Sequence, residues 1–460
     1  MNGVIMKKKN KSLNSWPPEL EALKQINLNA AGVDIGSSEI WVCVPEDRDE
    51  QSVKCFNSFT RDLQNIATWL KACNVDTVAM ESTGIYWIPL YDILEQAGLE
   101  VYLVNARHVK NLPGRKTDIF DCQWLQQLHT YGLLRPSFIP TKNIRSVRDL
   151  NRHKDNLIRY RASHIQHMQK ALHLMNIQLD NVISDITGKT GMQILRSIIS
   201  GQRNPKVLAT YRDPKCKNSQ AVIEKSLEGN YTPEYVFQLK QALELYDYYT
   251  DKIHECDQEI QKYYHYIPDK VDLNEKPLPP TSKKNSHSKN KPDYDLRKQL
   301  YRICGVDLTE IDGLNAITVQ TIITETGVDM SKWPTEKHFT SWLCVSPYNS
   351  ISGGKILKSK TKKSTNRANK ALRQAAQSLH HSNSALGAYF RRMRSRLGAP
   401  KAITATANKI ARIIYSMLKE QKSFIDLGAD YYQMKYQERE LKNLKKRAAK
   451  FGYQILPIAA

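Results

Sequence analysis

Apolar and polar positions over residues 30–140 change between a period of two and a helical period, which predicts an α/β domain. Three short runs, AAGVDIG, SEIWVCVP and SVKCFNSFT, are rich in β-branched and aromatic residues and close enough in sequence to form hairpin-linked, antiparallel strands. After them DLQNIATWLKACN has helical spacing, VDTVAMES is a buried strand, IPLYDILEQAG is a helix that ends at Gly98, and LEVYLVNA is a strand. A plain doubly wound fold would lack the opening three-stranded meander.

The order of these elements is that of an RNase H-like domain, and a helical region follows it. Over residues 145–265 apolar residues recur at intervals of three and four positions. This spacing is typical of two long helices that pair with each other or with another subunit. The positions are Ile165, Met168, Leu172, Met175 and Leu179 in the first helix, and Val236, Leu239, Leu243, Tyr246, Ile253, Cys256, Ile260 and Tyr263 in the second. We therefore expect a long coiled-coil middle.

The C-terminal part of the chain is predicted to be a mainly α-helical domain behind a mobile linker. Residues 273–295 are polar, rich in proline and poor in apolar residues. IDGLNAITVQTIITETG has the pattern of a helix, a glycine turn and a second helix, which suits either a DNA-gripping helix-hairpin-helix or an ordinary pair of helices. NRANKALRQAAQSLHH and ATANKIARIIYSMLKE are amphipathic helices with basic outer faces, and the charged tail is a solvated helix.

These patterns divide the 460 residues into six segments. They are a basic N-terminal arm (1–28), the RNase H-like domain (29–144), a helical coiled-coil spacer (145–268), a flexible linker (269–296), the C-terminal domain (297–425) and a charged tail (426–460).

Charge narrows the class of partner. The formal net charge is +22, which favours a polyanion, most simply nucleic acid, although other basic proteins share this trait. Residues 341–420 hold 16 Lys and Arg and one acid, Glu420. The eight cysteines include no CxxC pair, which argues against zinc knuckles and a disulfide framework, and no signal peptide or long apolar run is present. We expect a soluble, cytoplasmic protein.

Four carboxylates carry the candidate chemistry of the first domain. Asp34 interrupts an apolar strand, and Glu81 ends another, so both acids lie at strand ends. Asp118 and Asp121 are three residues apart, which places both on one face if they lie on a helix. Oxygen ligands without His or Cys suit Mg²⁺ or Mn²⁺ in phosphoryl transfer. Each acid alone also has an ordinary explanation as a helix cap, a strand-end residue or a surface charge.

Other features are open to competing interpretations. VDIGSS resembles the phosphate loop of the actin-like ATPase and sugar-kinase fold, but a second acidic phosphate loop and a glycine-rich adenosine site are not found. His164 and His167 have no acidic or cysteine companion and are assigned to a solvated helix face. Tyr86 and Trp87 are candidates for base stacking or for core packing.

A serine stands in the most basic stretch of the chain, VSPYNSISGGKILKSKTKKS. Ser352 precedes Gly353 and Gly354, and five lysines follow between positions 355 and 363. The glycines allow the backbone to approach a phosphate closely, and the lysines would neutralise it. Ser352 is therefore either a nucleophile held against a phosphate or a turn residue on a basic loop.

Taken together these motifs resemble a known family. GVDIG with Asp34, MESTG with Glu81, KTDIFD with Asp118 and Asp121, and SPYNSISGGK with Ser352 resemble the DEDD transposases of bacterial insertion sequences, of the insertion sequence 110 and 1111 type. The resemblance covers residues 30–145 and 300–420, with the helical segment as the spacer.

The resemblance implies a mechanism and a set of partners. The first domain would be RuvC-like, its four acids would hold Mg²⁺ or Mn²⁺, and the serine would attack a DNA phosphate to give a covalent protein–DNA intermediate. An RNA from the element's noncoding end would pair with target and donor DNA, and a dimer or tetramer would assemble the site in the bacterial cytoplasm. The residues expected to bind nucleic acid are Lys116, Lys355, Lys358, Lys360, Lys362, Lys363, Arg367 and Arg373.

Two other functions remain open at this point. A RuvC-like nuclease would cut DNA with water, and Ser352 would then be incidental to the reaction. A noncatalytic DNA- or RNA-binding protein would have acids that no longer hold a metal. Ser350, two residues from Ser352, is the reserve nucleophile.

Overall fold

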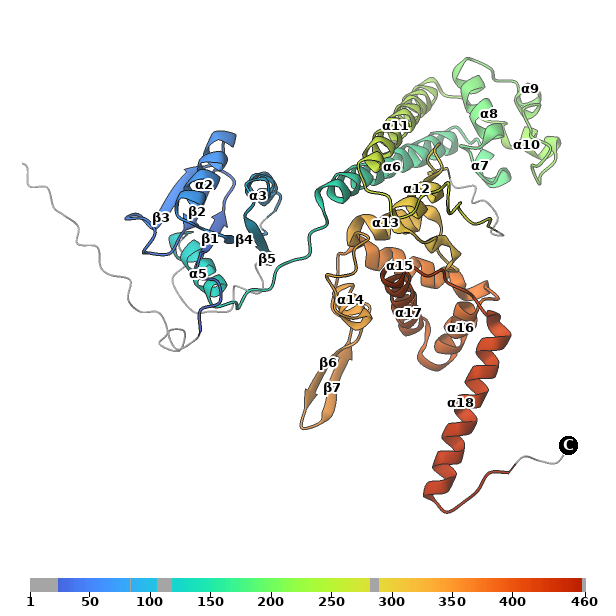
Figure 1. The fold of residues 1–460 in the computed structure, drawn as a ribbon. Coiled ribbons are helices and arrows are strands. Elements are labelled where there is room, and N and C mark those ends of the chain that lie inside the picture. The colour runs from blue at the N-terminus through green and yellow to red at the C-terminus, as the bar shows by residue number, and fades with distance from the viewer. Residues whose placement is uncertain (1–23, 83, 106–117, 282–288, 457–460) are drawn as a thin grey trace, which may run out of the picture. The chain divides into compact units, whose positions relative to one another are not determined.

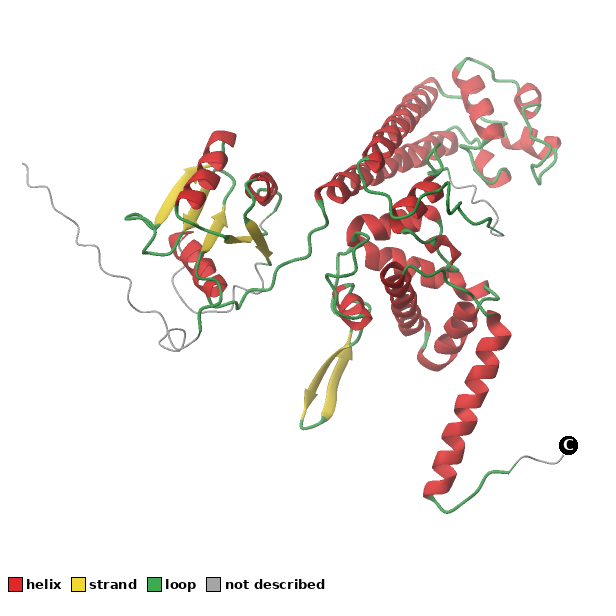
Figure 2. Ribbon diagram, in the orientation of Figure 1, coloured by secondary structure: helices red, strands yellow, loops and turns green. Residues whose placement is uncertain are grey.

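The computed structural model describes residues 24–82, 84–105, 118–281 and 289–456. Contacts divide the chain into two compact units, residues 1–139 and 140–460, each described separately below. Figure 1 labels their elements, and Figure 2 shows that the first unit combines strands and helices whereas the second is mainly helical. Within the described residues no helix is long and apolar enough to cross a membrane.

The first unit is a mixed five-stranded sheet with helices on both faces. Its strands are β1 (Ala30–Ile35), β2 (Glu39–Cys43), β3 (Val53–Asn57), β4 (Thr77–Glu81) and β5 (Glu100–Val104), and its helices are α2 (Thr60–Ala72), α3 (Trp87–Gln96) and α5 (Asp118–Thr130). The spatial order is β3-β2-β1-β4-β5. β1, β2 and β3 are antiparallel neighbours, while β4 is parallel to both β1 and β5. This confirms the predicted RNase H-like order, including the opening meander.

Alternate residues of each strand line two different cores. Val33 and Met80 belong to the core that also contains apolar residues of α2 and α3. Ala79 packs on the other face of the sheet against Leu125 and Leu128 of α5. Since side chains alternate along a strand, the even-numbered positions of β1 and the odd-numbered positions of β4 point to the α5 face.

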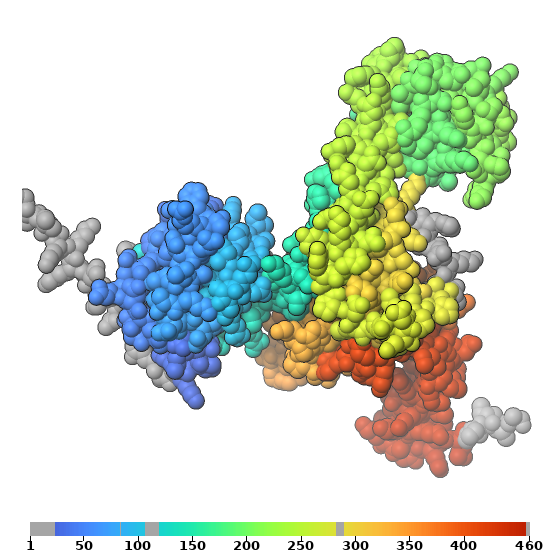
Figure 3. Space-filling model, turned by 45° about the horizontal axis from the view of Figure 1, so that its top comes forward, coloured from blue at the N-terminus to red at the C-terminus, as the bar shows by residue number. Residues whose placement is uncertain are grey.

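The second unit begins with a pair of long helices. These are α6 (Lys142–Leu174) and α11 (Pro233–His265). They pack along each other within one chain, which is one of the two predicted pairings, and a buried Lys154–Asp257 ion pair of 2.5 Å joins them. Figure 3 shows the surface of α11 in yellow-green, with the green lobe that connects it to α6 at one end.

That lobe was not predicted. It consists of α7 (Leu179–Val182), α8 (Lys189–Ile199), α9 (Pro205–Ala209) and α10 (Gln220–Ser226), which enclose a core with the adjoining ends of α6 and α11. The apolar period of the first helix was extended too far, because α6 ends at Leu174 and Asn176 has a φ of 55°. Met175 and Leu179 are buried in the lobe rather than along a coiled-coil seam.

Part of the segment expected to be a flexible linker contacts the long helices. Asn290 accepts hydrogen bonds from Lys154 at its backbone oxygen and from Arg161 at its side chain, at 3.4 and 2.6 Å. The ring of Tyr294 lies edge-on to that of Tyr264, with centroids 6.4 Å apart. The residues just before the C-terminal helices are therefore held in place.

The rest of the unit is helical apart from one hairpin. Its elements are α12 (Leu296–Cys304), the 3-10 turn η1 (Leu308–Glu310), α13 (Ala316–Thr326), α14 (Glu336–Trp342), β6 (Tyr348–Ser352), β7 (Lys355–Lys360), α15 (Arg367–Ser378), η2 (Leu379–His381), α16 (Ala385–Leu397), α17 (Ala399–Glu420) and α18 (Gly428–Lys450).

Two predictions for this region need correction and two are confirmed. The stretch IDGLNAITVQTIITETG contains only one α-helix, α13, because η1 and a turn at Gly313 precede it. The prediction of a basic loop around Ser352 is wrong for the flanking residues, which form β6 and β7, whereas Gly353 and Gly354 do form the turn between them. The two amphipathic helices are confirmed as α15 and α17, and the tail helix as α18, which has no buried residue.

Candidate functional site

Asp34 and Glu81 lie side by side at one edge of the first unit's sheet. β1 and β4 are parallel, and their register pairs Gly32 with Ala79 and Val33 with Met80. The next step along both strands brings Asp34 beside Glu81, on strands about 4.8 Å apart. Both side chains are half-buried, and both point to the face that α5 covers. The strand register thus joins two acids that are 47 positions apart in sequence.

Helix α5 crosses β1 so closely that only glycine fits beneath it. A Cβ atom on Gly32 would lie 2.2 Å from the backbone oxygen of Cys122 and 2.3 Å from the backbone nitrogen of Gln126. Gln126 also donates to the backbone oxygen of Ala30 at 3.3 Å. The N-terminal end of α5 therefore lies near the carboxyl end of β1, where Asp34 is.

The start of α5 carries the other two predicted acids. A hydrogen bond with Cys43, burial and the nearby charge of Asp34 together raise the pKa of the Cys122 thiol. Asp121, next to Cys122, is half-buried on this helix. Asp118 is the first residue of α5, but its side chain lies outside the described part of the chain, as does the whole of Lys116.

The sheet edge that carries Asp34 and Glu81 has the oxygen ligands of a divalent-metal site. Carboxylate oxygens are the ligands that Mg²⁺ and Mn²⁺ prefer, and α5 brings Asp121 to the side of the sheet that holds Asp34 and Glu81. Among the side chains that the structure describes, however, no three His, Cys, Asp or Glu form a metal-binding group. The four-acid site therefore stays a prediction.

In the second unit, Ser352 is the last residue of β6, directly before a two-residue turn. Gly353 and Gly354 have φ values of 54° and 75°, as a type I′ hairpin turn requires at both central positions. Nothing lies within 4 Å of a Cβ atom built on either glycine. All residues of both strands are exposed, so Ser352 lies at the tip of a hairpin that the protein itself does not cover.

A β-bulge gathers three lysines on the serine face of this hairpin. Ser352 pairs with Lys355 and Ile351 with Ile356, but the register then shifts and Ser350 pairs with Lys358. The shift leaves Leu357 as the extra residue of β7. Without it, Lys355 and Lys358 would point to opposite faces, because they are three positions apart.

The serine face therefore has a regular composition. It carries Tyr348 opposite Lys360, Ser350 opposite Lys358, and Ser352 opposite Lys355. Lys362 adds a further charge, since its ammonium lies 4.6 Å from the ring centre of Tyr348, and Lys363 is exposed nearby. Such a face suits the phosphate backbone of a nucleic acid strand. The opposite face of the hairpin carries the exposed Ile351 and Ile356.

Hydrogen bonds fix the base of the hairpin on the helices. The buried Asn369 of α15 donates to the backbone oxygen of Leu343 at 2.6 Å. Asn408 of α17 donates to the hydroxyl of Ser346 at 3.0 Å, and that hydroxyl donates to Thr340 at 2.8 Å. The hairpin thus projects from an anchored base.

The two predicted arginines have protein partners. Arg367 forms an ion pair of 2.6 Å with Asp155 of α6, and burial raises the pKa of Asp155 against the effect of this arginine. Arg373 donates to the hydroxyl of Thr404 at 3.0 Å. In this structure both help to hold α15 in place. Among the predicted nucleic-acid-binding residues whose side chains the structure describes, the exposed ones are Lys355, Lys358, Lys360, Lys362 and Lys363.

The aromatic and histidine candidates divide in two. Trp87 packs against the sheet core and lies edge-on to Tyr91, whereas Tyr86 is 49% exposed and free to stack. His164 stacks on Tyr249 at 5.4 Å, which sequence spacing did not indicate.

Comparisons with known proteins cover both regions. A family model for DEDD proteins of the IS110 type, described as a transposase, matches residues 31–177, which contain the four acids. A second model, described as the IS116/IS110/IS902 family of transposases, matches residues 307–391, which contain the hairpin. No curated protein matches the chain.

Proposed function

The chain belongs to the IS110-type DEDD transposases, and on that premise we propose that it cleaves and rejoins the DNA of its own insertion sequence through Ser352. The observation that carries this proposal is the hairpin itself. Ser352 lies at an exposed tip, opposite Lys355 and on the same face as Lys358 and Lys360.

The hairpin residues have distinct roles in this reaction. The Oγ atom of Ser352 attacks a DNA phosphorus, the bond from phosphorus to one deoxyribose oxygen breaks, and that oxygen leaves as a hydroxyl after taking up a proton. The proton of the serine hydroxyl passes to a carboxylate or to water. The lysines hold the phosphate and balance the charge that develops on its oxygens. In rejoining, a hydroxyl of another DNA end attacks the phosphoserine bond and restores the serine.

The acids of the first unit would support this step by binding a divalent cation. Asp34 and Glu81 are adjacent on the sheet, and Asp118 and Asp121 lie at the start of the helix that covers this face. Mg²⁺ or Mn²⁺ bound there would lower the free energy of the charged phosphoryl-transfer transition state.

In this proposal an RNA encoded in the element selects the DNA site. We infer this from the family, and the net charge of +22 favours nucleic acid as a partner. A dimer or tetramer would combine acids and serines from different copies of the chain.

The test is a covalent adduct. Protein co-expressed with the DNA that flanks its gene is incubated with labelled element-junction DNA and Mg²⁺, and the products are separated on a denaturing gel. The label should migrate with protein for the unaltered chain and for Ser350→Ala, and the adduct should be lost in Ser352→Ala. Ser350 is the matched control because it lies on the same face and also pairs with a lysine.

Acid variants separate the alternative functions. Asp34→Asn and Glu81→Gln should abolish cleavage, while Glu50→Gln, an exposed acid outside the site, should not. Cleavage without an adduct, unaffected by Ser352→Ala, would instead identify a metal-dependent nuclease. Binding without cleavage in any condition would identify a noncatalytic protein.

A further inference from the structure

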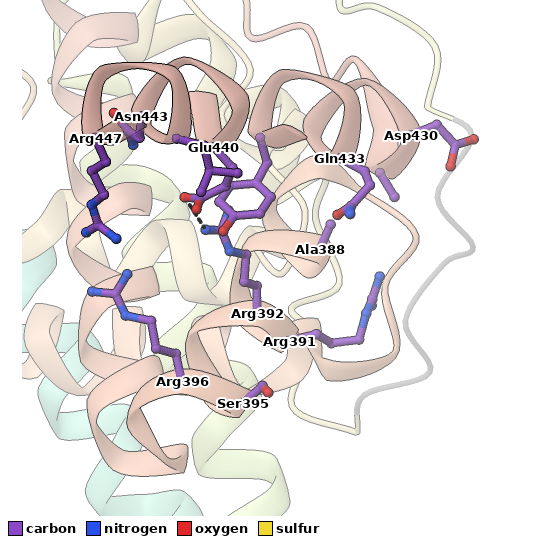
Figure 4. Close-up of a pocket in the computed structure, with 13 residues that line it drawn as sticks. Ala388, Arg391, Arg392, Ser395, Arg396, Asp430, Gln433, Glu440, Asn443 and Arg447 are labelled. Carbon is purple, nitrogen blue, oxygen red and sulfur yellow. Dashed lines mark ion pairs between the residues drawn. The ribbon is translucent and has the colours of Figure 1, made fainter. Parts of the chain in front are cut away.

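A second basic site lies between α16 and α18, and most of its residues lie beyond those that the family models match. It is a cavity of about 940 Å³, and Figure 4 shows the side chains that line it. From α16 it receives Arg391, Arg392 and Arg396, and from α18 it receives Arg447. The matched residues end at Arg391, so most of this lining belongs to the extension of the chain.

Two of the four arginines are already engaged within the protein. Arg391 donates to the backbone oxygens of His380 and Ser382, at 3.2 and 2.6 Å. Arg392 lies 3.9 Å from a carboxylate oxygen of Glu440 and over the ring of Tyr436. The contacts of Arg392 join α16 to α18, whereas those of Arg391 join α16 to the residues just before it.

The other two arginines face each other across the cavity. Arg396 and Arg447 come from different helices, and Figure 4 shows their guanidinium groups pointing toward one another. Across the described ranges of the chain neither has an ion-pair partner, and both are exposed. Two like charges so arranged repel unless an anion lies between them. Guanidinium groups bind phosphate through paired N–H donors, so a phosphate suits this position.

The cations continue beyond this cavity, which points to an extended polyanion rather than a single small anion. An adjoining hollow between α16, α17 and α18 is lined by apolar residues, one acid (Asp426) and the cations Lys409, Lys435 and Arg439. Lys435 forms an ion pair with Glu438 at 3.0 Å. Burial and the neighbouring Arg439 and Arg412 lower the pKa of Lys409, as expected where positive charges crowd together.

Helix α18 contacts α16 through the Arg392 interactions and through the ring of Tyr432, which lies edge-on to that of Tyr389. It has 23 residues and none of them is buried. A polyanion bound between α16 and α18 would contact both helices and neutralise the repulsion between them. We propose that the α16–α18 cleft binds the phosphate backbone of nucleic acid, as a site separate from the Ser352 hairpin and independent of the serine chemistry.

The test compares two double variants of the full-length protein. Arg396→Gln with Arg447→Gln removes the facing pair, and Lys442→Gln with Lys446→Gln removes the same charge from exposed positions of α18 that do not line the cavity. Because all four residues are exposed, the core is untouched. Affinities for labelled DNA and RNA duplexes of about 20 base pairs are measured with EDTA, between about 50 and 200 mM salt.

The expected result is a smaller salt dependence in the arginine variant alone. Each phosphate contact contributes about 0.9 to the slope of log affinity against log salt, so losing two should lower the slope by about two. The loss of affinity over this salt range then becomes about tenfold smaller. A change on RNA alone assigns the cleft to the guide, on DNA alone to the element or target, and on both to the backbone they share. An unchanged slope on both duplexes, or an equal change in the lysine variant, overturns the proposal.

Discussion

Replacing both turn glycines of the β6–β7 hairpin with valine is expected to separate Ser352 from its lysines without unfolding the protein. Gly353 and Gly354 both have positive φ values, which β-branched residues strongly avoid. Each L-residue forced into this conformation costs about 1–2 kcal/mol. The double substitution therefore costs the closed hairpin about 2–4 kcal/mol.

That cost is large for this element. A two-stranded hairpin is marginally stable by itself, and all strand residues of this one are exposed, so no core compensates for the strain. At about 1.4 kcal/mol for each factor of ten, the closed population falls by roughly 30-fold to several hundred-fold. The core is not involved, so the melting temperature should be unchanged.

The assay is the yield of covalent protein–DNA adduct, measured beside a thermal melt. Gly353→Asn is the matched control, because asparagine accepts a positive φ and favours this position of a type I′ turn. The control should keep the adduct, and the double valine variant should lose it at an unchanged melting temperature. Equal yields from the two variants would refute the role of the turn in positioning Ser352.

Three further predictions concern packing and protonation. Gly32→Ala should push α5 from β1 by about 1 Å, destabilise the first unit by about 1–3 kcal/mol and reduce cleavage about 100-fold, measured by denaturation and by single-turnover cleavage. Asn369→Ala leaves the Leu343 oxygen unpaired and should cost about 1–3 kcal/mol in urea denaturation, whereas a cost below about 0.5 kcal/mol would contradict the anchoring role. His129 is 1% exposed, and burial lowers its pKa to about 4. The unfolded state therefore binds more protons than the folded state below about pH 6.5, and the free energy of unfolding should fall by about 2 kcal/mol from pH 8 to pH 5. Hydrogen exchange of the backbone amides of β1 and β4 measures this change, which should be absent in His129→Gln.

The sequence by itself determined the local elements and the residue types of the site. Short runs rich in β-branched, aromatic and other apolar residues identified every strand of the first unit, and the carboxylates at two strand ends followed from the cost of burying a charge in an apolar run. The helical period identified α6, α11, α15 and α17. These signals are readable because each depends on neighbours within a few positions along the chain.

Only the tertiary structure decided which residues meet. Parallel pairing of β1 with β4 places Asp34 beside Glu81, a bulge places Lys355 on the same face as Lys358, and Arg367 pairs with Asp155 of a distant helix. The lobe between α6 and α11 and the facing arginines of α16 and α18 were likewise invisible in the sequence. The physical reason is that strand register, bulges and helix packing depend on contacts between distant segments, and periodicity along one segment carries no information about its partner.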